Sequence, residues 1–313
     1  MKDMKYTAPL LMFLAACIWG AAFVAQSEAT QYIGPFTFNS IRFLLGSVVL
    51  LPLIWFKSRN KKEKSYNNDK SYKKSNWIAG ISCGVVLTFA SFFQQYGIGF
   101  TTVGKAGFIT ALYIIIVPFL GLLFGRKISK VLMLSLIVAL MGLYLLCMQT
   151  SDLKMINYGD LMVMICAVLF SVHILVIGHF APKTDGVIVS CIQFFTGFVL
   201  SGIGAILFET IKTHAIIQAY IPILYAGIFS CGVAYTLQII AQKKIDPSLA
   251  SLIGSLESVT AAVAGWLILG QTMSLKESIG SLLVFFAIIM AQLPERKVQE
   301  INEISFSVRN FEK

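Results

Sequence analysis

The sequence predicts an all-α polytopic membrane protein whose ten transmembrane helices form two inverted five-helix repeats. The first observation is composition, because 57% of the 313 residues are hydrophobic and only 13% are charged, whereas an average soluble domain is about 25% charged. The second is the division of the chain into ten apolar segments. The third is that motifs of the first five segments recur, in the same order, in the second five.

Each of the ten segments is long enough to cross a bilayer, since about 20 mostly apolar residues span roughly 30 Å of hydrocarbon. The expected spans are 7–27, 35–56, 77–98, 104–124, 130–149, 158–178, 186–207, 216–239, 248–270 and 275–293. Glycine and proline mark several of their ends. We expect 7–149 to form the first repeat, 158–293 the second, and 294–313 a cytoplasmic tail.

The internal repeat is visible in two motif pairs. Residues 41–46 (IRFLLG) match 192–197 (IQFFTG) at an offset of 151, and 125–129 (GRKIS) match 270–274 (GQTMS) at an offset of 145. The offset falls because the first copy carries a longer charged loop. Since each copy has an odd number of spans, the second is upside down in the bilayer. Two inverted halves around a site at the midplane are typical of secondary transporters.

The basic residues predict the orientation of the chain. The loop 57–76 contains eight Lys or Arg residues, and basic loops remain in the cytoplasm. With ten spans, twenty of the 25 basic residues fall on the side of this loop and four on the other. Both termini are therefore expected in the cytoplasm of a bacterial cell, with the chain in the inner membrane. Binding of anionic lipid head groups by this loop is a weaker, additional hypothesis.

Signals of an enzyme or a metal protein are missing from the sequence. All six cysteines fall in apolar segments without a CxxC pair, which argues against a disulfide framework or a metal site. His173, His179 and His214 are too far apart for a local metal motif, and no Walker-type loop, HExxH or GxSxG occurs. We expect no enzyme activity, cofactor or metal. The net charge of +10 is assigned to membrane orientation rather than to nucleic-acid binding.

Two charged residues lie inside predicted spans, where charge is costly and usually functional. Glu257 lies about ten residues into the ninth span; it would bind a substrate ammonium group or accept a proton, or else form a structural hydrogen bond between helices. Arg42 lies in the outer half of the second span. We expect it to extend outward and pair with Glu28, and binding of a substrate carboxylate is the alternative.

Polar and aromatic residues at similar depth complete the set of candidates. Gln193 occupies the repeat position of Arg42, and His173 lies at a similar depth. For most aromatic residues the alternative is helix packing or anchoring at the membrane interface. The predicted cavity-lining or substrate-binding residues are Trp19, Arg42, Gln94, Tyr96, Tyr113, His173, Gln193, Tyr235, Gln238 and Glu257.

Five short motifs in order resemble the ten-helix, EamA-type branch of the drug/metabolite transporter superfamily. They are residues 17–20 (CIWG), 41–46 (IRFLLG), 159–161 (GDL), 255–259 (SLESV) and 270–271 (GQ). The resemblance covers about residues 9–292. The chain departs from the family pattern at three positions, with Ser258 in place of a frequent proline and Arg126 and Gln271 in place of frequent glutamates.

The resemblance implies that helices 1–4 and 6–9 surround a central cavity while helices 5 and 10 are peripheral. It implies alternating-access transport of a small organic solute, with export of amino acids or related metabolites as the first hypothesis. Efflux of aromatic or cationic toxic compounds is the second. A channel, or a sensor or assembly protein that transports nothing, is the alternative of another class. Membrane lipid and a small-molecule substrate are the expected partners, and monomer and homodimer both remain open.

Overall fold

The computed structural model describes residues 4–59, 70–101, 103–123, 125–126, 128–148, 157–269 and 274–292. Regular structure in these ranges is helical throughout. The predicted tail 294–313, residues 60–69 of the basic loop and the Gly270-Gln271 motif lie outside the described residues.

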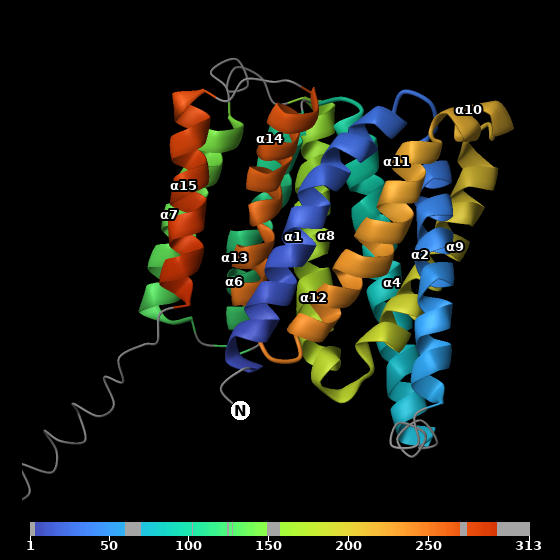
Figure 1. Cartoon of the computed structure of the whole chain (residues 1–313), viewed down its shortest axis with the longest axis horizontal. Helices are drawn as coiled ribbons and strands as arrows, with labels where there is room; N and C mark the ends of the chain where they lie inside the picture. Colours follow the sequence, from blue (N-terminus) through green and yellow to red (C-terminus); the bar gives the residue numbers. More distant parts are fainter. Residues whose placement is uncertain are drawn as a thin grey trace, which may run out of the picture.

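The spans of the first repeat are coloured from blue to green in Figure 1. They are α1 (Met4–Ala29), α2 (Pro35–Ser58), α4 (Lys70–Ile98), α5 (Val103–Ala111) with α6 (Tyr113–Leu123), and α7 (Lys130–Cys147). The second repeat contains α8 (Tyr158–Phe180), α9 (Gly186–Phe208), a span made of α11 (Tyr220–Leu224), η3 (Tyr225–Tyr235) and α12 (Thr236–Ala241), then α13 (Pro247–Gly254) with α14 (Leu256–Leu269), and α15 (Leu275–Ala291). Two short helices, η2 (Ala181–Lys183) and α10 (Thr213–Gln218), lie in connections.

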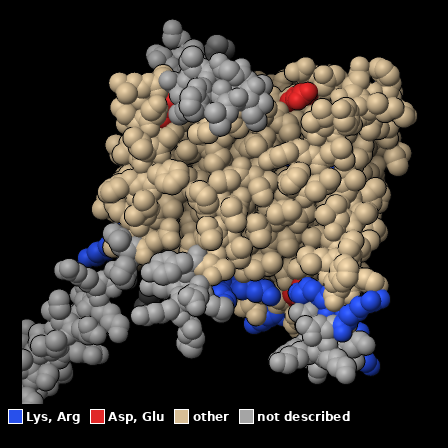
Figure 2. Space-filling model, viewed as in Figure 1, with Lys and Arg blue, Asp and Glu red and all other residues tan. Residues whose placement is uncertain are grey.

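Among the described residues, nine segments have the length and hydropathy of a membrane span. The tenth is α15, whose 17 residues extend about 25 Å at 1.5 Å per residue. Figure 2 shows that the charged side chains visible on one face lie at the two ends of the bundle, with an uncharged band between them. We call the end where α1 begins the basic end, because Lys and Arg gather there, and the other the opposite end.

Contacts between helices follow the internal repeat. Helices at equivalent positions pack against each other, α2 against α9 and α7 against α15. The other contacts recur in both halves, since α1 packs against α14 and η3, while its counterpart α8 packs against α6 and α4. The predicted fold class, ten helices in two inverted repeats, is thereby confirmed. Figure 1 shows α7 and α15 at one side of the bundle, as the resemblance implied.

Three predicted spans differ from continuous α-helices. The fourth is interrupted at Leu112 and the ninth at Ser255. In the eighth, residues Tyr225–Tyr235 form a π-helix, a form that is rare and often found at functional sites. The third span begins at Lys70 rather than at residue 77, because its first polar turns continue the helix beyond the apolar band. The hydrophobic pattern alone does not reveal the two breaks or the π-helix, since apolar residues continue across each of them.

The peripheral helices α7 and α15 are in backbone contact at two glycines. A Cβ atom on Gly280 would lie 2.6 Å from the carbonyl oxygen of Gly142 and 2.6 Å from the backbone nitrogen of Leu146. Small residues permit this close approach, and van der Waals packing drives helix association in a bilayer.

Helices α2 and α9 are joined at both ends by carboxylates. At the opposite end, Glu209 accepts hydrogen bonds from the backbone N–H of Phe36 (2.7 Å) and from the backbone N–H and hydroxyl of Thr37 (2.8 and 2.6 Å), which caps α2. At the basic end, Asp185 caps α9 through the N–H of Val187 (2.8 Å) and pairs with Lys57 of α2 at 2.7 Å.

The Asp185 carboxylate lies outside the spans and is sensitive to pH. Burial alone would raise the pKa of this carboxyl, but the hydrogen bond and charge of Lys57 and the N–H groups of Ile188 and Val187 outweigh burial, so the pKa lies below its ordinary value of 3.8. A lowered pKa means that the ionised carboxylate stabilises the fold above the ordinary pKa and that this stabilisation disappears as the pH falls through the folded-state pKa.

We predict that Gly280→Ala lowers the melting temperature, because the added methyl group must separate α7 and α15, and overpacking costs about 1–3 kcal/mol. The matched control is Gly232→Ala, whose Cβ would meet Val49 at an ordinary 3.4 Å. Thermal unfolding of both variants in detergent tests this. Equal melting temperatures would contradict the close contact.

We also predict that Asp185→Asn makes stability less dependent on acid pH. Asparagine still caps α9, but it lacks the titrating charge that faces Lys57. The wild-type melting temperature should fall more steeply than that of the variant between about pH 5 and about pH 2. Parallel curves for the two proteins would show that this ion pair does not stabilise the fold.

Candidate functional site

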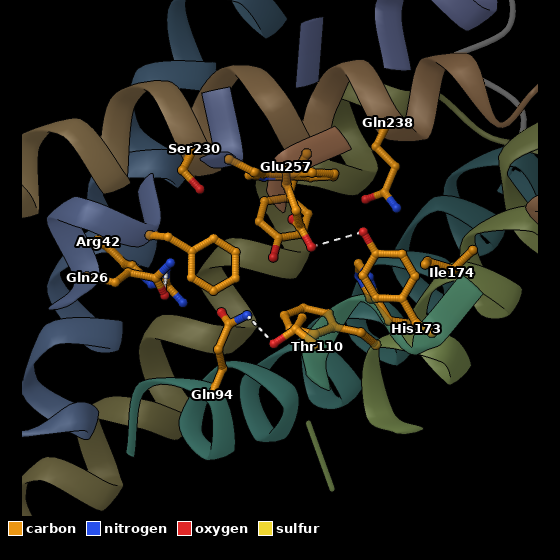
Figure 3. A pocket seen from close by; sticks show the side chains of 14 residues that line it. Gln26, Arg42, Gln94, Thr110, His173, Ile174, Ser230, Gln238 and Glu257 are labelled. Atoms are coloured by element: carbon orange, nitrogen blue, oxygen red, sulfur yellow. Dashed lines mark hydrogen bonds between the residues drawn. The ribbon is translucent and has the colours of Figure 1, made fainter. Parts of the chain in front are cut away.

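A cavity lies between the two repeats and is lined by residues from both of them (Figure 3). It contains about 490 Å³ of empty space, including the part open to solvent. The lining residues are Trp19, Phe23, Gln26, Arg42, Gln94, Thr110, Tyr113, Phe170, His173, Ile174, Ser230, Tyr235, Gln238 and Glu257.

The two interrupted spans place an acid and a phenol in this cavity. Tyr113 is the first residue of α6, and Glu257 is the second residue of α14, so each follows a break in the fourth span of its repeat. The Tyr113 hydroxyl donates a hydrogen bond to Glu257 Oε1 at 3.0 Å. Irregular backbone at membrane depth is tolerated where it is buried in protein or lines a cavity, and the positive end of α14 stabilises a carboxylate in its first turn.

Glu257 is 6% exposed. Its hydrogen bond from Tyr113 is neutral, and within the described part of the chain no Lys, Arg or His lies within ion-pair distance of its carboxylate. A buried carboxylate without a cation is costly. The site therefore holds a carboxyl group that a positively charged ligand would stabilise in its ionised form.

Arg42 is turned into the protein rather than outward. It is 2% exposed, its Nη1 donates to Gln26 Oε1 at 3.3 Å, and its guanidinium lies 5.2 and 5.1 Å from the ring centroids of Phe38 and Phe43. Its Nε atom is buried without a partner. The guanidinium thus retains donors that no described residue satisfies.

The predicted pairing of Arg42 with Glu28 is wrong. Glu28 is exposed at the surface of α1, whereas Gln26, two residues earlier, faces the cavity and contacts the guanidinium. Positions two apart on a helix point about 200° away from each other, so only one of these two side chains can meet Arg42.

Arg42 and Glu257 therefore line one cavity without pairing with each other, as far as the described residues extend. Figure 3 shows Arg42 beside Gln26 at one side of the cavity, with Glu257 nearer the middle. Two ionisable groups of opposite charge that are buried without pairing are each costly. A ligand with complementary charges would satisfy both.

His173 is fully buried, and its ring is hydrogen-bonded to Gln193. The His173 Nε2 atom lies 3.2 Å from Gln193 Oε1, and Gln193 itself is not among the residues that line the cavity. The ring of Tyr235 lies 5.9 Å from that of His173 and 4.9 Å from that of Trp19. These aromatic groups form one wall of the cavity.

The remaining candidates separate into two places. Gln94 lines the cavity and lies 3.5 Å from the hydroxyl of Thr110, and Gln238 also lines it. Tyr96 instead faces a groove at the opposite end, with Phe36, Phe92 and Glu209 among its lining residues. Gln94 and Tyr96 are two positions apart on α4, so they face opposite sides of the helix.

Sequence reasoning missed six lining residues. Gln26 could have been predicted, since it is an amide within an apolar span. Thr110 and Ser230 could not, because Thr and Ser are common in helices, where their hydroxyls often bond to the preceding turn. Phe23, Phe170 and Ile174 cannot be told from packing residues by type.

Two glutamines form equivalent hydrogen bonds on either side of the cavity. Gln95 of α4 donates from Nε2 to the backbone oxygen of Gln26 of α1 at 2.9 Å. Gln242, which follows α12, donates from Nε2 to the backbone oxygen of Ile174 of α8 at 3.0 Å. Because α12 and α8 are the repeat counterparts of α4 and α1, we call these two hydrogen bonds the glutamine latches.

Ion pairs join helices beyond the glutamine latches. At the opposite end, Lys105 of α5 pairs with Asp160 of α8 at 2.6 Å, with both side chains nearly buried. At the basic end, Arg126 after α6 pairs with Asp246 before α13 at 2.9 Å in a more exposed position. Each pair joins one repeat to the other, so both ends of the bundle are held by contacts across the repeat interface.

The sequence model of the EamA-like transporter family matches the chain twice, over residues 7–148 and 157–292. Among similar proteins, one from Archaeoglobus fulgidus is 27% identical over 91% of this chain and 86% of its own length. Another, from Clostridium kluyveri, is 24% identical over 87% and 88%. Both are named as uncharacterized transporters.

A solved structure, titled only as the crystal structure of a protein, shares the fold. It superimposes with a TM-score of 0.73 over 92% of this chain and 97% of its own, at 20% identity. With a family match that extends over both repeats, the chain belongs to the EamA-like transporter family of the drug/metabolite transporter superfamily, as a multi-pass membrane transporter.

Proposed function

We propose that this protein is a secondary transporter that exports amino acids or related metabolites across the bacterial inner membrane. The observation that carries the proposal is the pair of buried, unpaired opposite charges, Arg42 and Glu257, in one central cavity. An amino acid carries a carboxylate and an ammonium group on one carbon. It therefore supplies both missing partners while remaining neutral overall.

The roles of the two residues follow from their chemistry. The planar guanidinium of Arg42 matches a carboxylate in a two-point hydrogen-bonded geometry. The carboxylate of Glu257, with one hydrogen bond from Tyr113, retains acceptor capacity for an ammonium group. A simple cation would use only Glu257 and leave Arg42 buried without a partner, which favours a zwitterion.

Efflux of aromatic or cationic compounds is the second candidate. It is supported by the adjacent rings of Trp19 and Tyr235, 4.9 Å apart, because aromatic faces attract organic cations. These rings also suit the side chain of an amino acid, so they do not by themselves separate the two candidates.

We infer that the glutamine latches close the two sides of the cavity in turn. Each latch joins a helix that ends near one side of the membrane to a neighbouring backbone carbonyl, and inverted repeats exchange roles in alternating access. Both latches are formed in the described structure. Release of one latch would then widen the opening on its own side of the cavity.

The proposed orientation places the basic end in the cytoplasm. The Lys and Arg side chains visible in Figure 2 gather at this end, and cytoplasmic loops are enriched in Lys and Arg. The latch of Gln242 then closes the cytoplasmic side and the latch of Gln95 the outer side.

We predict that Glu257→Gln and Arg42→Gln each lower amino-acid counterflow in proteoliposomes by about tenfold or more, because hydrogen bonds to charged groups contribute about 1.5–3 kcal/mol. Glu28→Gln is the matched control, since this carboxylate is exposed on α1, and it should transport normally. Wild-type counterflow by folded Glu257→Gln protein would remove this carboxylate from the mechanism.

A second prediction separates the latches. In cells that carry Ser230→Cys in the cavity, adding Gln95→Leu should raise labelling by an impermeant thiol reagent from outside by about 2- to 10-fold, the effect of one hydrogen bond. Gln242→Leu should lower it and raise labelling from the cytoplasmic side of inverted vesicles.

Two controls accompany this experiment. The parent protein with its native cysteines gives the background, and exposed Ser58→Cys at the basic end should react only from the cytoplasmic side. Reaction of Ser58→Cys in intact cells would overturn the orientation. The same response to both glutamine variants would overturn the alternating roles of the latches.

A further inference from the structure

Three buried polar atoms on the aromatic side of the cavity have no hydrogen-bond partner. They are Nε1 of Trp19, Nδ1 of His173 and Oε1 of Gln238, and all three residues line the cavity. A buried polar atom without a partner costs more free energy than a satisfied one gains. Unpaired atoms that gather in one place therefore point to a ligand group that completes them.

The three residues surround one side chain, Tyr235. Its ring contacts the rings of Trp19 and His173, and Gln238 follows it by three residues, which places both on one face of their span. Figure 3 shows Gln238 and His173 at the side of the cavity away from Arg42 and Gln26. This group, Trp19, His173 and Gln238, is here called the amide pocket.

The hydrogen-bonding roles in the amide pocket are defined by its neighbours. Oε1 of Gln193 faces His173 Nε2 at 3.2 Å, and we therefore assign the imidazole proton to Nε2, which donates to this oxygen. With this tautomer Nδ1 of the neutral imidazole is an acceptor. Gln238 Oε1 is a second acceptor, and the indole N–H of Trp19 is a donor. The three unpaired atoms thus comprise two acceptors and one donor.

A primary carboxamide offers the complementary set, two N–H donors and one carbonyl acceptor. We propose that the amide pocket selects amino acids with a carboxamide side chain, of the glutamine and asparagine class, or the closely similar ureido class. This inference rests on the proposed function, in which Arg42 and Glu257 bind the carboxylate and ammonium groups. The side chain then extends toward His173 and Gln238.

The same arrangement disfavours other side chains. Arg42 and Glu257 are the only charged residues that line the described cavity. The α-carboxylate and α-ammonium groups of the ligand occupy both of them. A charged ligand side chain would therefore have no counter-ion. An aliphatic side chain of similar size leaves the three polar atoms unpaired. Sites that hydrogen-bond a ligand group reject analogues that lack it far more strongly than apolar pockets reject a smaller side chain.

The test is a binding series on the purified full-length protein in nanodiscs, measured by calorimetry with L-glutamine, L-asparagine, L-glutamate, L-leucine and L-lysine. Carboxamide amino acids should bind at least about 100-fold more tightly than L-leucine. Gln238→Leu and His173→Phe should each reduce this ratio by about tenfold, whereas Gln218→Leu, an identical change on exposed α10, should preserve it.

The outcomes separate this inference from the proposed function. Equal affinity for L-leucine and L-glutamine overturns the amide pocket and leaves amino-acid transport standing. An equal loss of both ligands in Gln238→Leu also overturns it, because a merely structural role would weaken all ligands alike. No binding or counterflow of any amino acid overturns the proposed function together with this inference. If the pocket variants fail to fold, the wild-type series alone decides.

Discussion

The lack of water in the bilayer core is the constraint on which the whole structure depends. Backbone N–H and C=O groups must find partners within the protein, so spans are helical and interruptions occur only against protein or a cavity. The breaks at Leu112 and Ser255 and the π-helix Tyr225–Tyr235 obey this rule, because Tyr113, Tyr235 and Glu257 line the cavity at or beside them. Irregular backbone thus coincides with the site.

The same constraint makes Arg42 and Glu257, which do not pair with each other, energetically costly. In water, Arg42 and Glu257 would each be hydrated, and in a closed pair they would neutralise each other. The fold does neither: it surrounds Arg42 with Gln26, Phe38 and Phe43 and leaves Glu257 with the hydroxyl of Tyr113.

Family membership makes the chain a transporter, so the hypothesis of a sensor that transports nothing loses its support.

The apolar segments and the repeated motifs predicted the ten spans and their inversion, because spans follow from hydrophobicity and the inversion follows from an odd number of spans in each repeat. The cavity was only partly predictable. Polar residues such as Gln94 and Glu257 stood out within apolar segments, but their partners depend on how helices rotate about their axes. Tyr96 and Glu28 show the limit, since a rotation of two residues turns each away from the centre. Breaks within apolar segments leave no hydrophobic signature.

The double attachment of α2 to α9 has a mechanical consequence. Glu209 and Asp185 join this pair at its two ends, so the helices resist sliding along each other. In the proposed alternating-access cycle, the rocking helices would pivot about this pair. Arg42 lies on α2 of this pair, whereas Glu257 lies on α14, which would move relative to the pair in that cycle. The distance between the guanidinium and the carboxylate would then change in each transport cycle, and the affinity for a zwitterion would change with it.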